Sequence, residues 1–134
     1  MENMSPNEKS AILRDVAKAS RQAMISLLGE PITDAVLFHL KRNLERNPFE
    51  VLWENPKVFY NGLREIFGQE GCKVLVMGLA EILAEKSGID LNPRGLVKLM
   101  DSEDSRSVKE LQKILKEIAN LYASSEKGGF KVDE

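Results

Sequence analysis

Apolar residues recur at intervals of three or four along most of the chain, which is the spacing of one face of an α-helix. The first such segment begins at Ser5, which can cap a helix, followed by Pro6 in the first turn and by Glu8, which completes a capping box. Gly29 ends it. Its apolar positions include Ile12, Leu13, Val16, Ala23, Met24, Leu27 and Leu28. The pattern predicts a long N-terminal helix that either packs on the body of the protein or acts as a dimerising arm.

A second helix is predicted from Pro31, and three Asn-Pro pairs mark further helix starts. The pairs lie at residues 47–48, 55–56 and 92–93. An asparagine oxygen can accept a hydrogen bond from the unpaired amides of a helix start, and proline fits the first turn because no donor is needed there. The first pair predicts a short helical turn that carries Trp53. The second predicts a helix ending near Phe67, and the third predicts a short helix ending near Met100.

The segment from about Glu70 to Ser87 is apolar on much of its circumference, which predicts the central and most buried helix. The polar residues 101–107 predict a loop, and the helical period returns from Val108. The chain as a whole predicts an all-α fold without strands: a compact bundle of about five to six helices, several of them short, with longer N- and C-terminal helices. Residues 1–123 are expected to form a single domain, and residues 124–134 a flexible tail.

Composition narrows the class of protein without pointing to a reaction. The 134 residues are 43% hydrophobic and 30% charged, which fits a globular domain, and the aromatic share of 6% favours helix packing. The net charge of −2 and the absence of a strongly basic stretch argue against a nucleic-acid partner. One cysteine and one histidine exclude an internal disulfide, a cysteine-based zinc site and the usual histidine-rich metal sites. No membrane span or signal peptide is evident, so we expect a cytoplasmic protein. We also expect no cofactor.

The stretch IFGQEGCKVLV, residues 66–76, only partly resembles two phosphate-binding loops, the P-loop and the G-x-x-G loop of a KH domain. A P-loop needs G-x-x-x-x-G-K-[ST] after a strand, whereas Gly68 and Gly71 are three apart and follow a helix. A KH domain does place G-x-x-G between two helices. Here, however, Glu70 puts a carboxylate where a phosphate would lie, and the strands of that fold are missing.

We therefore interpret this stretch as a corner between two helices. Gly68 would end one helix in the left-handed conformation, Gly71 would permit a close crossing, and Cys72 would be a small buried residue. Free amides at the start of the next helix could still attract an anionic ligand, unless Glu70 fills that place. Trp53 is either an exposed recognition residue or a plug at the edge of the core, and the core is favoured. The candidate ligand or turn site comprises Trp53, Phe67, Gly68, Gly71, Cys72 and Lys73.

The C-terminal helix carries an apolar stripe with lysines and glutamates on its other face. The stripe is formed by Leu111, Leu115, Ile118 and Tyr122. Two roles are open for it: it presents an interface to a partner or to a second copy of the chain, or it closes the core of its own domain.

Residues 27–89 resemble a family of small helical output domains in archaeal proteins, the nitrosopumilus-type output domain, which occurs alone or attached to signalling modules. Three features carry the resemblance: LGE at residues 28–30, P-x-x-F at residues 56–59, and L-x-x-I-F-G-x-x-G at residues 63–71. The resemblance implies a regulatory or interaction role in signal transduction, and no reaction.

The leading hypothesis is a non-enzymatic interaction or regulatory module that acts through protein–protein contacts, with a partner protein or as a homodimer. The rivals are a nucleic-acid-binding helical protein, through Gly68 and Gly71, and a sensor of a small ligand in a pocket beside Trp53, Phe67 and Cys72. An enzyme is the least favoured class, because no nucleophile–base pair or metal constellation is present in the sequence.

Overall fold

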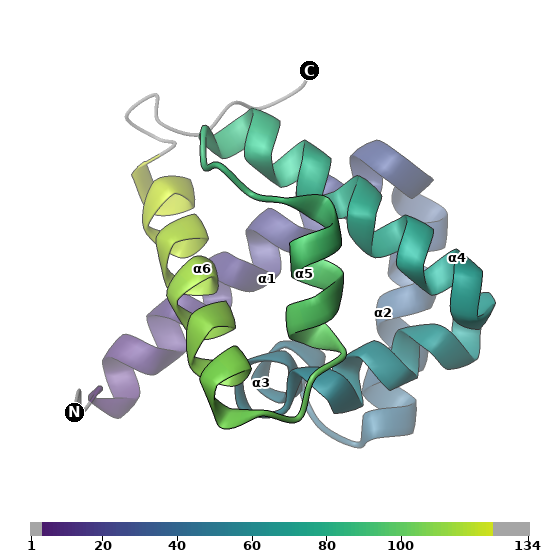
Figure 1. Cartoon of the computed structure of the whole chain (residues 1–134), viewed down its shortest axis with the longest axis horizontal. Helices are drawn as coiled ribbons and strands as arrows, with labels where there is room; N and C mark the ends of the chain where they lie inside the picture. The colour runs from purple at the N-terminus through teal and green to yellow at the C-terminus, as the bar shows by residue number, and fades with distance from the viewer. Residues whose placement is uncertain (1–3, 125–134) are drawn as a thin grey trace.

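Six α-helices make up most of residues 4–124, the part of the chain that the computed structural model describes (Figure 1). They are α1 (Pro6–Leu28), α2 (Glu30–Leu44), α3 (Pro48–Glu54), α4 (Pro56–Ser87), α5 (Pro93–Met100) and α6 (Ser105–Ala123). No strand occurs between residues 4 and 124, so the all-α prediction is confirmed. Of the predicted tail at 124–134, every residue after 124 lies outside the described part.

The helix starts follow the capping residues of the sequence. The Ser5 hydroxyl accepts a hydrogen bond from the amide of Glu8, whose carboxylate accepts one from the amide of Ser5, both at 3.1 Å. Asn47 accepts from an amide two residues further on at 2.9 Å, and Asn92 from an amide three residues further on at 2.8 Å. Asn55 makes no such side-chain bond, so two of the three Asn-Pro pairs cap a helix as predicted.

The helices predicted on either side of the glycine corner are two halves of one kinked helix, α4. Gly68 interrupts the helical conformation with φ 79° and ψ 172°. The positive φ was expected, but this ψ is extended and not that of the left-handed helical conformation. The chain thus turns at one residue and resumes its helix at once. We call residues 69–87 the distal half of α4.

The predicted loop at residues 101–107 is wrong for its last three residues, which form the first turn of α6. The side chain of Asp104 accepts a hydrogen bond from the amide of Arg106 at 3.4 Å, and this caps the helix. The first turn of a helix needs oxygen atoms to cap its free amides and does not need apolar contacts. A polar first turn can therefore have the same composition as a loop, and the sequence pattern does not distinguish the two.

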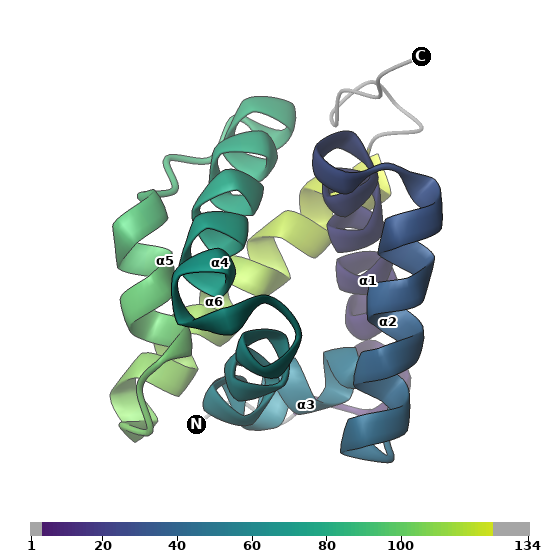
Figure 2. The same ribbon diagram turned by 90° about the vertical axis from the view of Figure 1, so that its right-hand side faces the viewer.

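The helices enclose a single apolar interior. α1 packs along both α2 and α6, α4 packs along α5, and α3 closes one end against α4 (Figures 1 and 2). The largest fully buried side chains come from four different helices and include Val16, Leu40, Leu63, Val76 and Leu111. Within residues 4–124, no helix is long and apolar enough to span a membrane.

Candidate functional site

The glycine corner is exposed at Gly68, while Gly71 lies inside the distal half of α4. Lys73 is exposed as well, and its Nζ lies 3.7 Å from Oε2 of Glu70, one turn earlier in the same helix. The corner therefore presents a paired lysine and carboxylate, which is a poor place for a phosphate group.

Cys72 is fully buried, as predicted, and its Sγ lies 3.6 Å from the backbone oxygen of Tyr60. Burial raises the pKa of the Cys72 thiol, which disfavours the thiolate needed for nucleophilic attack or metal binding. Burial, followed by the effect of Cys72, also raises the pKa of Tyr60 to about 12. Both groups thus stay protonated near neutral pH, and this pair offers no activated nucleophile.

Trp53 belongs to the core, which is the role that the sequence favoured. Only 7% of its surface is exposed, and its backbone oxygen accepts a hydrogen bond from Nε2 of Gln112 at 2.8 Å. Of the three residues beside which a ligand pocket was expected, Trp53 and Cys72 are buried and Phe67 is partly buried. Phe67 lines a surface groove to which neither Trp53 nor Cys72 contributes.

This groove runs between the C-terminal end of α1 and α4, and we call it the α1–α4 groove. It has a volume of about 410 Å³. Leu27 of α1 lies over Gly78 of α4, where a Cβ atom would come within 3.0 Å of the Leu27 Cδ2. The groove is lined by Leu27, Leu28, Phe67, Gly71, Val74, Leu75, Met77, Gly78 and Glu81. Figure 2 shows the two elements that carry these residues, the teal distal half of α4 and the dark blue end of α1.

The surface of the groove is apolar and its surroundings are acidic. Val74 is 67% exposed, the highest value for a large apolar side chain in residues 4–124. Glu81 is the only charged residue among those that line the groove, and Glu85 lies one turn further along α4. The nearest cations on this helix are Lys73, which is paired with Glu70, and Lys86, which is buried. On the α1 side, Nη2 of Arg21 lies 3.4 and 2.7 Å from carboxylate oxygens of two residues of α2. An occupant of this groove would therefore meet apolar side chains flanked by a surplus of negative charge.

The apolar stripe of α6 is not available as an interface. Leu111, Leu115 and Ile118 are buried by the chain itself, with exposed fractions of 1%, 7% and 2%. Tyr122 is partly buried, and its hydroxyl accepts a hydrogen bond from Nε2 of Gln22 on α1 at 3.4 Å. Of the two roles left open for this stripe, its burial supports the second, closing the core of its own domain, because α1 and α5 pack against α6.

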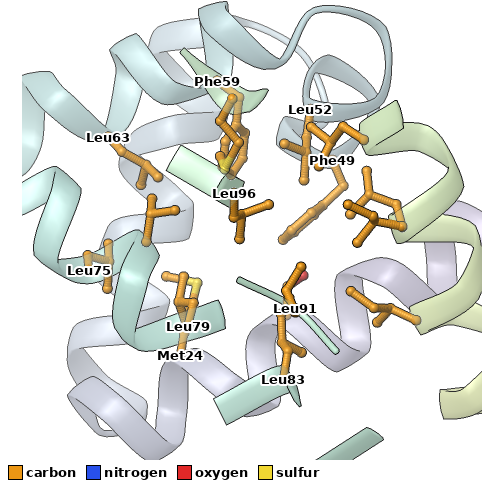
Figure 3. A pocket seen from close by; sticks show the side chains of 17 residues that line it. Met24, Phe49, Leu52, Phe59, Leu63, Leu75, Leu79, Leu83, Leu91 and Leu96 are labelled. Atoms are coloured by element: carbon orange, nitrogen blue, oxygen red, sulfur yellow. The ribbon is translucent and has the colours of Figure 1, made fainter. Parts of the chain in front are cut away.

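A largely enclosed apolar cavity lies at the centre of the molecule, and we did not predict it from the sequence. Its volume is about 60 Å³, and Figure 3 shows side chains from five helices converging on it. None of the seventeen lining residues is exposed. They are Ser20, Met24, Phe49, Leu52, Phe59, Leu63, Leu75, Val76, Leu79, Leu83, Leu91, Leu96, Met100, Leu111, Ile114, Leu115 and Ile118.

The cavity is large enough for water but chemically unsuited to it. One water needs about 10–15 Å³ of such space and two to four polar partners. Ser20 provides the only polar side chain in the lining. At about 24 cal/mol per Å³, a void of this size lowers stability by ~1.4 kcal/mol relative to a filled core.

A further hollow, of about 540 Å³, lies between α3, α4 and α6 and is lined mostly by polar and charged residues of both signs, including Glu103 and Lys109. Among residues 4–124, no three His, Cys, Asp or Glu side chains gather where they could hold a metal ion. The α1–α4 groove and the central cavity are two hollows of the described chain whose linings are mostly apolar.

The chain was compared with protein-family models, curated proteins and solved structures, and none of them matches it.

Proposed function

We propose that this protein is a non-enzymatic interaction module that binds a helix of a partner protein in the α1–α4 groove. The observation that carries the proposal is the exposure of Val74 in the wall of an apolar groove. An exposed valine alone is ordinary, but one that continues into the apolar surface of Leu27, Phe67 and Met77 forms a patch that water solvates poorly. An amphipathic helix is the usual occupant of such a groove.

The charges around the groove favour a basic helix. Lys73 and Arg21 are already paired with carboxylates of this chain, whereas Glu81 and Glu85 make no ion pair within residues 4–124. A helix with apolar residues on one face and lysines or arginines at its edges would cover the apolar wall and meet these carboxylates. The same carboxylates would repel nucleic acid.

The resemblance to output domains is consistent with this role. All nine residues that line the groove lie within residues 27–89, the segment that carries the resemblance. We propose that the groove is the surface through which such a domain passes a signal to its partner, as an element of archaeal signal transduction.

A designed peptide tests the proposal. The probe is a fluorescently labelled helical peptide with leucines on one face and lysines at the edges, and its binding is followed by fluorescence anisotropy. The wild type should bind it, and Val74→Asp should weaken binding by about tenfold or more, because the substitution puts a charge in the apolar wall. The matched control is Val58→Asp, which changes another exposed valine of α4 that lies outside the groove and should leave binding unchanged.

Two results would count against this proposal. If Val58→Asp weakens binding as much as Val74→Asp does, the peptide is attracted by net charge and not by the groove. If light scattering shows a dimer of the wild type that Val74→Asp dissociates, the occupant is a second copy of the chain and not a partner protein.

A second peptide with glutamates in place of the lysines should bind more weakly than the first, and the difference between the two peptides should be smaller at high salt.

A further inference from the structure

The central cavity has the properties of a binding site for a small apolar molecule, and it is separate from the α1–α4 groove. Its lining comes from α1, α3, α4, α5 and α6 and from Leu91 between α4 and α5. Figure 3 shows Met24, Leu75, Leu83 and Leu96 approaching the same space from different sides. We propose that this cavity binds one uncharged apolar molecule of about four heavy atoms or fewer, such as a short hydrocarbon or a diatomic gas.

The chemistry of the lining sets the class of ligand. Sixteen of the seventeen lining side chains have no hydroxyl, amide or charged group, and the exception is Ser20. A polar ligand would lose its hydrogen bonds to water and recover almost none of them here. An apolar ligand gives up no hydrogen bonds on leaving water and gains contacts with atoms that now face a void.

The volume sets the upper size. A space of about 60 Å³ holds roughly four to six water-sized spheres at 10–15 Å³ each. Met24 and Met100 are the flexible members of the lining, and their unbranched side chains can adjust to the outline of a bound molecule. Because none of the lining residues is exposed, entry requires a local opening of the bundle.

Xenon is the first probe, because it is apolar, monatomic and readily titrated by pressure. Methyl resonances of the intact protein are followed by NMR as the xenon pressure rises. Saturable shifts are expected at Leu96 and Met100, which line only the cavity, and not at Val74 and Met77, which line only the groove. Leu75 lines both hollows and does not discriminate between them. Propane and ethanol then form a matched pair of similar size, of which only propane should give saturable shifts.

A pair of substitutions separates the cavity from general changes in packing. Val76→Ile adds a methylene group to a lining residue and should abolish the saturable shifts. Val51→Ile makes the same change at a buried valine outside the lining and should preserve them. Circular dichroism confirms that both variants fold. If the shifts grow linearly with pressure, are strongest at Val74 and Met77, or persist in a folded Val76→Ile variant, the proposal is overturned. The peptide experiment on the groove is unaffected by any of these results.

Discussion

The helix α6 and the distal half of α4 differ in how far their apolar side chains are buried. α6 has one narrow apolar face, and the chain buries most of it, as the 1% exposure of Leu111 shows. The distal half of α4 is apolar on much of its circumference, with Leu75 and Val76 buried on one side and Val74 left 67% exposed on the other. From the sequence we expected the distal half of α4 to be the most buried helix, and we left open whether the stripe of α6 carries an interface or closes the core.

The difference shows that the amount of apolar surface on a helix predicts burial less well than its distribution does. A narrow stripe matches the width that neighbouring helices can cover, so it ends inside the bundle. A helix that is apolar on most sides needs neighbours on most sides. In this small bundle α1 and α5 cover only part of the distal half of α4, and the uncovered part is the α1–α4 groove.

The largest expected effect tests this contrast directly. Leu111→Ala should lower the free energy of unfolding by about 2–5 kcal/mol, because it leaves a void beside the central cavity. Val74→Ala should change it by no more than about 0.5 kcal/mol. Urea denaturation followed by circular dichroism measures both. Equal losses from the two variants would mean that Val74 is covered in solution, and the contrast between the helices would disappear.

The kink at Gly68 is the next most sensitive point, because it sets the direction in which the distal half of α4 leaves the corner. Its φ of 79° and ψ of 172° lie in a region that is essentially restricted to glycine. Gly68→Ala should therefore lower the free energy of unfolding by about 1–3 kcal/mol. Urea denaturation measures the loss.

Gly71→Ala is the matched control, three residues further on. Residue 71 is helical, and an added Cβ would lie 3.2 Å from the Cβ of Phe67. This crowding opposes a gain in helix propensity of up to about 1 kcal/mol, so the variant should be close to neutral. If Gly68→Ala were equally neutral, the kink would not be what orients the distal half of α4.

A smaller effect is expected at the flank of α6, where the sequence gives no apolar signal. Gln112 donates a hydrogen bond of 2.8 Å to the backbone oxygen of Trp53. Gln112→Ala should lower the free energy of unfolding by about 0.5–1.5 kcal/mol, since it leaves a partly buried carbonyl without this donor. Lys113→Ala, at the exposed neighbouring position, should have almost no effect in the same urea assay. A Gln112→Ala variant as stable as wild type would show that apolar contacts alone hold α6.

Local signals predicted the helices well because caps and glycines act over a few residues. Ser5, Gly29 and Asn92 each bound a helix where the sequence placed the boundary. The all-α class followed from the same signals. Two predictions differed from the structure: Gly68 kinks a helix instead of ending it, and residues 105–107 form a helical turn instead of a loop. Whether a helix continues at such positions depends on contacts with other parts of the chain, which a local sequence pattern does not contain.

The candidate sites were less predictable because they depend on which helices meet. Trp53 and Cys72 were correctly favoured as core residues, since their types and flanking turns indicate burial. The α1–α4 groove joins residues 27–28 to residues 67–81, and the cavity joins five helices, so neither is visible as a motif. A surplus of apolar positions around the distal half of α4 was the one available signal, and it was interpreted as burial.

The smallest expected effect on stability concerns Glu54, the last residue of α3. Its neighbour Trp53 is the residue to which α6 is hydrogen-bonded. The carboxylate of Glu54 lies 2.9 Å from Nη2 of Arg46 and 3.1 Å from Nζ of Lys9, which ties α3 to the start of α1. The hydrogen bond from Arg46, followed by that from Lys9, lowers the pKa of Glu54 below its ordinary value of 4.5. A lowered pKa in the folded state stabilises the fold above that ordinary value, and the contribution disappears as the pH falls through the lowered pKa.

Glu54→Gln should therefore lower the free energy of unfolding by less than about 1 kcal/mol at neutral pH, because the ion pairs are well exposed to solvent. The difference from wild type should shrink towards zero as the pH is lowered below 4.5, and urea midpoints measured at successive pH values would reveal this. Glu117→Gln on the exposed face of α6 is the control, since Glu117 makes no ion pair within residues 4–124, and it should show no such trend. A difference that stays constant down to the most acidic pH would mean that the negative charge of Glu54 contributes nothing to the tie between α3 and α1.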